Sequence, residues 1–161
     1  MNKGIVESYE CFVKILKVLE QLGAECQVEE GASEAEISDY EQKIGYKFVD
    51  EYKDWLKLTK GIKVSLGSIF VQIYMPDKAE VHEDGFKALF IGDDAGFKNY
   101  YINLETGKSY IYDDDFGTTE FDSFEELLDE IYYSDIEEKL DGEEETENWD
   151  NIYDEMFPEN N

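Results

Sequence analysis

Adjacent carboxylates are the residues of this chain whose types and spacing could support chemistry. Asp93-Asp94 and the run 113–115, three aspartates, each stand where a predicted strand meets a loop. Such clusters can hold Mg²⁺ or Ca²⁺, and a carboxylate pair can hydrolyse glycosides if burial raises the pKa of one member. The spacing lacks the alternating ligands and the twelfth-position glutamate of an EF-hand loop. Because 41 acidic residues make adjacent aspartates common by chance, we predict no metal site here.

Other catalytic patterns are missing from the sequence. His82 is the only histidine and lies in a polar loop between Glu80 and Glu83, where we expect it to be exposed. We find no Cys/His cluster for zinc, no phosphate-binding glycine loop followed by Lys-Ser/Thr and no Ser-His-Asp arrangement. We therefore predict no cofactor and no enzyme activity. A hydrolase using paired aspartates remains an alternative, and it would need a deep cleft with a buried carboxylate.

The charge of the chain is concentrated in its C-terminal third. Residues 109–161 hold 21 of the 41 acidic side chains and a single lysine, Lys139, a net charge of −20. The whole chain of 161 residues carries a net charge of −27 and contains no arginine. Such a surface repels nucleic acid and anionic lipid and attracts basic proteins. We predict a basic protein partner, with no nucleic acid and no membrane.

Aromatic side chains beside these carboxylates suggest where the partner would bind. Tyrosine and phenylalanine supply rigid contact area, and carboxylates next to them can pair with lysine and arginine. The candidate contact residues are Asp93, Asp94, Phe97, Tyr100, Tyr112, Asp113, Asp114, Asp115 and Phe116. In the alternative interpretation, the tyrosines of this region (Tyr101, Tyr110, Tyr112) are core residues of a hairpin. The acids would then be solvated surface that keeps the protein soluble.

Helices are predicted where apolar residues recur at spacings of three and four. The first runs over residues 5–22 and stops at Gly23, followed by a connector over residues 24–32. Ser33 and Glu36 form a capping box that opens a second helix, which ends at Gly45. A third helix covers about residues 50–59. A second capping box, Ser123 with Glu126, opens a fourth helix over residues 124–133. We expect Cys11, beside the first apolar stripe, to be a small buried residue.

Between the third and fourth helices the pattern changes to that of strands. Runs rich in β-branched and aromatic residues predict strands over residues 62–66, 68–75 and 87–91, with a loop over residues 77–85. Residues 100–104 and 109–112 flank Glu105-Thr106-Gly107-Lys108 and predict a hairpin. An acidic turn follows at residues 113–117.

Residues 141–161 form an acidic extension. Residues 141–148 are predicted to be a solvated linker, and apolar residues beyond them have the spacing of a short amphipathic helix. These are Trp149, Ile152, Tyr153, Met156 and Phe157. We expect this helix to dock on the body and complete the core. The alternative is a detachable helix that covers a binding surface.

The order of these elements resembles the SUKH superfamily. Residues 33–61, SEAEISDYEQKIGYKFVDEYKDWLKLTKG, resemble the opening of that family, with Glu41, Gly45, Tyr52, Leu56 and Gly61 at matching places. FIGDDAGFKNYYINLETGKSYIYDDD resembles its glycine/aspartate turn and tyrosine-rich hairpin, and FDSFEELLDEI resembles its closing helix. The resemblance covers about residues 5–135. It implies a single α+β domain with a largely antiparallel sheet and helices packed mainly on one side.

The resemblance also implies a function. The superfamily includes bacterial immunity proteins that neutralise toxins, commonly nucleases, and a yeast regulator of cell-wall assembly. We therefore predict a SUKH-like domain over residues 1–140, with an acidic extension over residues 141–161, that binds and neutralises a basic toxin domain. The alternative is a regulatory module that binds an endogenous basic protein. With no signal-peptide core and no 18-residue apolar run, the expected compartment is the cytoplasm. Like-charge repulsion favours a monomer.

Overall fold

A computed structural model describes residues 1–83 and 85–159, apart from the side chain of Glu145. The chain begins with the long helix α1 (Lys3–Gln21), whose first turn is capped by Asn2. The Asn2 Oδ1 atom accepts a hydrogen bond from the Ile5 N–H at 3.1 Å. The helix confirms the predicted amphipathic pattern, and Ile5, Phe12, Ile15, Leu16, Val18 and Leu19 form its buried apolar face. Cys11 points away from that face and is exposed, so its predicted burial was wrong.

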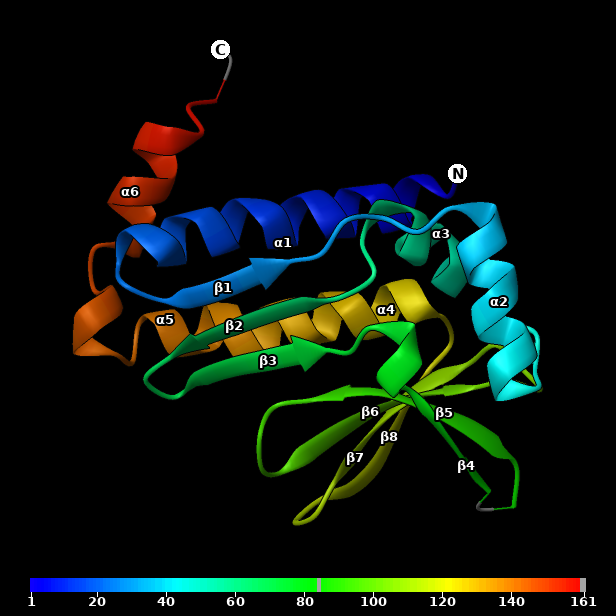
Figure 1. Cartoon of the computed structure of the whole chain (residues 1–161). Helices are drawn as coiled ribbons and strands as arrows, with labels where there is room; N and C mark the ends of the chain where they lie inside the picture. Colours follow the sequence, from blue (N-terminus) through cyan, green and yellow to red (C-terminus); the bar gives the residue numbers. More distant parts are fainter. Residues whose placement is uncertain (84, 160–161) are drawn as a thin grey trace.

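Two shorter helices follow at one end of α1 (Figure 1). The predicted capping box opens α2 (Glu34–Ile44), with both the Ser33 side chain and the Glu36 side chain bonded as expected. Gly45 ends α2 in the left-handed conformation, at φ 86°. Helix α3 (Asp50–Leu58) buries Tyr52, Trp55 and Leu56.

All strands of the described chain join one eight-stranded antiparallel sheet, in the order β1-β2-β3-β5-β6-β7-β8 with β4 beside β5. The predicted strands and hairpin are confirmed with small shifts of their ends. The strands are β1 (Glu25–Val28), β2 (Ile62–Leu66), β3 (Ile69–Ile73), β4 (Glu80–Glu83), β5 (Lys87–Asp93), β6 (Lys98–Asn103), β7 (Ser109–Asp113) and β8 (Gly117–Phe121).

Three strands lie where the sequence predicted none. Strand β1 is in the expected connector, and the short helix η1 (Pro76–Lys78) and β4 are in the expected loop. Strand β8 follows the acidic turn. These strands are largely exposed and polar, and each has a single neighbouring strand. These strands are defined by backbone hydrogen bonds to their neighbours, and neither face of them is buried. Their sequences therefore show no alternation of apolar and polar residues.

Strand β5 changes partner along one edge. Its first half pairs with β4 from Lys87 to Phe90, whereas Gly92 and Asp93 pair with β3. The ladder with β6 shifts register between Phe90 and Gly92. A Cβ atom on Gly92 would lie 2.1 Å from the backbone oxygen of Gln72, so only glycine fits where β3 pairs with β5.

The closing helix is longer than predicted. Helix α4 (Phe124–Glu130) continues through a π-helical segment, η2 (Ile131–Glu137), into α5 (Glu138–Leu140). The Ser123 hydroxyl accepts from the Glu126 N–H at 3.2 Å as expected. The Glu126 carboxylate, however, accepts from the Asp122 N–H rather than from Ser123, so the second capping box is only half formed. The Glu51 carboxylate caps the same helix end by accepting from the Phe124 and Glu125 N–H groups.

The core lies between the sheet and the helices on one of its faces. Helices α1, α4 and α5 run along β2 and β3 (Figure 1). Trp55 is fully buried among three edge-on rings, with its centroid about 6 Å from those of Tyr9, Phe12 and Phe124. Edge-to-face packing is favourable because the positive edge of one aromatic ring contacts the negative face of another. The structure confirms a single α+β domain.

The C-terminal extension lies against the body. After η3 (Glu144–Thr146), helix α6 (Trp149–Met156) rests beside the C-terminal end of α1 (Figure 1). Trp149, Ile152, Tyr153 and Phe157 pack on the core in partly buried positions. Thr146 is buried and donates to the Leu140 carbonyl, so the predicted linker is not fully solvated. Among the described residues, no helix is long and apolar enough to cross a membrane.

Candidate protein-interaction surface

Two turns that are separate in the sequence meet at one edge of the sheet. The β5–β6 turn and the β7–β8 turn adjoin because β6 and β7 are antiparallel neighbours, with Lys98 paired to Asp113. The Asp114 N–H donates to the Phe97 carbonyl at 3.1 Å and ties the turns together. We call this surface the acidic tip; it consists of Asp93, Asp94, Phe97, Asp113, Asp114, Asp115 and Phe116.

Two aspartates of the acidic tip each accept two backbone hydrogen bonds within the turns. Asp94 Oδ1 accepts from the backbone N–H groups of Phe97 and Lys98, at 3.1 and 2.8 Å. Asp113 Oδ1 accepts from the N–H groups of Asp115 and Phe116, at 2.8 and 3.3 Å. Carboxylates that bond their own backbone in this way fix tight turns. The turns therefore hold their shape before any partner arrives.

Asp93 is a partly buried carboxylate of the acidic tip. Its Oδ1 atom accepts from the Ala95 N–H at 2.9 Å, and its Oδ2 atom accepts from the Tyr74 hydroxyl. Burial raises the pKa of Asp93, the Ala95 N–H partly offsets this, and the charge of Asp94 adds to the increase. Ala95 itself takes the left-handed backbone conformation, at φ 70°.

The remaining tip residues point into solvent. Asp114 and Asp115 are exposed, and the Phe116 side chain is 90% exposed. Phe97 is 65% exposed. The acidic tip therefore combines exposed aromatic rings with negative charge.

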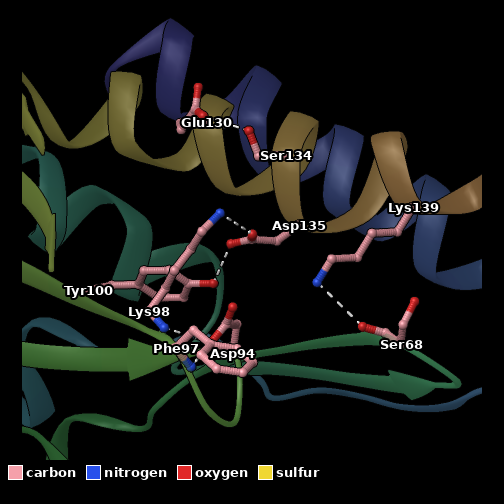
Figure 2. Close-up of polar contacts among 9 residues, drawn as sticks. All are labelled: Ser68, Asp94, Phe97, Lys98, Tyr100, Glu130, Ser134, Asp135 and Lys139. Atoms are coloured by element: carbon pink, nitrogen blue, oxygen red, sulfur yellow. Dashed lines mark hydrogen bonds and ion pairs between the residues drawn. The ribbon is translucent and has the colours of Figure 1, made fainter. Parts of the chain in front are cut away.

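Tyr100 does not belong to this surface. Its side chain is fully buried, and its hydroxyl donates to Asp135 Oδ2 at 2.5 Å (Figure 2). Strand residues alternate between faces, and two adjacent tyrosines, Tyr100 and Tyr101, put one aromatic ring on each face of β6. The predicted contact role of Tyr100 is therefore wrong for this conformation. Tyr112 is 43% exposed and lies on the opposite face, the one without helices, in register with Asn99 and Thr118.

Asp135 links the acidic tip to the closing helix, and sequence reasoning missed it. Lys98 Nζ donates to Asp135 Oδ1 at 2.9 Å, next to the Tyr100 hydroxyl (Figure 2). Burial and the neighbouring Asp135 charge raise the pKa of Tyr100 well above its ordinary value. Burial alone would lower the pKa of Lys98, but its hydrogen bond and charge pairing with Asp135 outweigh that and raise it. No local motif marks Asp135, because the π-helical segment sets the direction of its side chain.

The buried carboxylates of the described chain serve structure. Asp135 is bonded as above, and Glu41 accepts from the Phe48 N–H at 2.7 Å with Lys53 Nζ at 3.8 Å. His82 is exposed, as expected. In the described ranges, no three His, Cys, Asp or Glu side chains gather closely enough to hold a metal ion.

One known protein family matches more than half of this chain. The model of the SMI1 / KNR4 family (SUKH-1) matches residues 31–130. The chain belongs to the SMI1 / KNR4 family (SUKH-1). A search of curated proteins found no match.

The SUKH-1 match runs from the residues before α2 to the end of α4, so it contains the whole acidic tip. Helix α1, η2 with Asp135, and α6 lie outside it. Membership of SUKH-1 confirms the predicted resemblance. It supports an immunity-type or SMI1-like role in protein interaction, in a family that is generally non-catalytic.

Proposed function

We propose that the chain is a cytoplasmic, monomeric immunity protein that binds and neutralises a basic, nuclease-type toxin domain through the acidic tip. The observation that carries this proposal is the meeting of two preformed turns, which places five carboxylates around two exposed phenylalanines. Family membership supports the protein-binding role, and the charge of −27 supports the basic partner.

The physical mechanism is competition for a cationic groove. A nuclease holds phosphates with lysine and arginine, and carboxylates of the acidic tip would occupy the same side chains. Long-range attraction would speed encounter and weaken with added salt. The exposed rings of Phe97 and Phe116 would then be buried and supply the anchors on which affinity depends.

The direct test is a pull-down from the source organism at low and high salt, with the retained proteins identified by mass spectrometry. We expect one basic, toxin-like protein that is captured at low salt and stays bound at higher salt. A broad set of basic proteins that wash off together would contradict the proposal, because the surface would then act as a generic ion exchanger. A single endogenous non-toxin partner would instead support the regulatory alternative. An immunity gene is also expected beside a toxin gene.

A matched pair of variants tests the location of the surface. The first replaces Asp113, Asp114 and Asp115 with Asn, which keeps an oxygen for the turn hydrogen bonds. The second, Glu10→Gln with Glu20→Gln and Glu25→Gln, changes net charge equally at exposed positions of α1 and β1, outside the acidic tip. We expect only the first to reduce capture. Equal capture by both variants would show that the partner binds elsewhere.

A further inference from the structure

The sheet face turned away from α1 and α4 carries a continuous row of aromatic rings. Phe90 on β5, Tyr101 on β6 and Tyr110 on β7 stand next to one another, because residues paired across a sheet share a face. Ring centroids are 5.3 Å apart for Phe90 and Tyr101, and 5.0 Å for Tyr101 and Tyr110, whose planes differ by only 12°. Tyr74 extends the row at one end, 5.3 Å from Phe90.

Two rings of this row, Tyr101 and Tyr110, line a hollow of about 280 Å³. Ala88 on β5 forms part of its wall, and this small side chain leaves room between Phe86, which precedes β5, and Phe90. Ala88 is only 1% exposed, yet it is not part of the core cluster, since it faces the aromatic side. The walls are the side chains of His82, Phe86, Tyr101, Tyr110, Tyr112 and Thr118.

Carboxylates stand on both sides of this aromatic hollow. Glu120 on β8 lies in register with Tyr110, and Glu80 on β4 lies in register with Phe90. Glu120 forms an ion pair with Lys108 at 3.3 Å, and its side chain is 62% exposed. Exposed ion pairs are weak, so a cationic side chain of a partner can compete with Lys108 for Glu120. Glu80 Oε2 lies 3.4 Å from His82 Nε2 at the rim.

We propose that the aromatic hollow binds an arginine side chain of a partner protein, with the guanidinium against the tyrosine rings and its N–H groups directed at Glu120. The flat faces of tyrosine attract cations, and the planar guanidinium stacks on them while donating in its own plane. A sugar ring or a neutral aromatic group could also stack here. The flanking carboxylates and the charge of −27 favour the cation.

The site is separate from the acidic tip but continuous with it. Tyr112 lines the hollow and is followed in the chain by Asp113 of the tip. One basic segment could therefore reach both. The hollow needs no particular toxin, and its proposal stands or falls independently of the function proposed for the tip.

The test is an NMR titration of the full chain with the peptide acetyl-Gly-Arg-Gly-Arg-Gly-amide, followed through the ring signals of Tyr101 and Tyr110. The matched probe is the same peptide with citrulline, a neutral amide of nearly the same shape, in place of arginine. We expect the arginine peptide to bind and the citrulline peptide to bind at least roughly two- to fivefold more weakly, the size of an exposed cation–π contact. Equal binding of both peptides would overturn the cation assignment.

Three variants test the position. Ala88→Leu fills the hollow without changing charge, Tyr112→Ala removes a half-exposed wall ring that no core packing needs, and Glu120→Gln removes the flanking charge. We expect each to weaken arginine binding at least roughly two- to fivefold. The triple Asn variant of Asp113–Asp115 is the control and should bind the peptide almost normally. The opposite pattern, loss in the tip variant with Tyr112→Ala unaffected, would place the peptide on the tip and overturn the proposal.

Discussion

Lys98 and Asp135 form an ion pair of 2.9 Å between the first residue of β6 and the π-helical segment η2. Asp135 is 1% exposed, and the Tyr100 hydroxyl donates to its second oxygen. The pair thus fixes the strand that follows the β5–β6 turn to the helical layer. The acidic tip is consequently held by the core rather than by its loops alone.

We predict that Asp135→Ala lowers the free energy of unfolding by about 2–3 kcal/mol, because it leaves Lys98 and Tyr100 without their buried partner. Asp135→Asn should cost less, since an amide oxygen can still accept one of the two hydrogen bonds. Urea unfolding at neutral pH measures both. Glu138→Ala, an exposed acid one helical turn away, is the control and should change the free energy by less than about 0.5 kcal/mol. A similar loss in both alanine variants would contradict a special role for Asp135.

The raised pKa of Tyr100 predicts how the free energy of unfolding changes at alkaline pH. Its pKa is raised above the ordinary value of 10.0, so the unfolded chain releases this proton at a pH where the folded chain still holds it. Lys98 behaves likewise above its ordinary 10.5. The free energy of unfolding should therefore fall as pH rises above about 10.

Tyr100→Phe isolates this effect. Below pH 10 the variant should be less stable by about 1.5–3 kcal/mol, because Asp135 loses a hydrogen bond to a charged acceptor. Above pH 10 the gap to the unmodified protein should narrow, since phenylalanine has no proton to lose. Denaturant unfolding between pH 8 and 11 measures the gap. A gap that stays constant over this range would argue against the raised pKa.

Gly92 is expected to tolerate no side chain. A Cβ atom there would meet the Gln72 backbone oxygen at 2.1 Å, so Gly92→Ala must separate β3 from β5 and should cost about 2 kcal/mol or more. A Cβ atom added to Gly96 in the β5–β6 turn would have no described atom within 4 Å, apart from the glycine itself and its chain neighbours. Gly96→Ala should thus be nearly neutral, and thermal unfolding compares the two. Equal melting temperatures would mean that the pairing of β3 with β5 is more adaptable than its geometry indicates.

The acidic tip should govern how fast the partner associates. Replacing Asp113, Asp114 and Asp115 with Asn is expected to slow association by roughly tenfold at low salt, with little effect on folding. The difference should shrink as salt is added, because screening already removes the attraction. Stopped-flow or surface-binding kinetics with the captured partner measure this. Unchanged kinetics would remove these residues from the interface.

Phe116 should instead govern how long the complex lasts. Because its ring is 90% exposed, Phe116→Ala should leave the free energy of unfolding within about 0.5 kcal/mol of the unmodified protein. If the ring is an anchor, dissociation should become about tenfold faster or more. Tyr133, another exposed aromatic side chain, lies on η2 outside the acidic tip, and Tyr133→Ala is the control. Equal dissociation rates for both variants would exclude Phe116 as an anchor.

The sequence predicted the elements that have a hydrophobic period. Helices α1 to α4 and strands β5 to β7 follow from apolar spacing and capping residues. Strands β1, β4 and β8 were not predicted because their side chains are largely polar and only backbone pairing defines them. The burial of Tyr100 was not predicted because either Tyr100 or Tyr101 could have faced the core. The partner of Lys98, Asp135, depends on a helical irregularity that no residue pattern marks.

The change of partner along β5 divides the sheet mechanically. Strands β3 and β5 share only the pairs Gln72–Asp93 and Ile73–Gly92, whereas β2 with β3 and β5 with β6 share five pairs each. Backbone amides at this seam are therefore the natural place for the sheet to open without global unfolding, and they should exchange with deuterium sooner than those of β2 or β6. Strand β6 would stay attached to the helical layer through Lys98 and Asp135 while this seam opens.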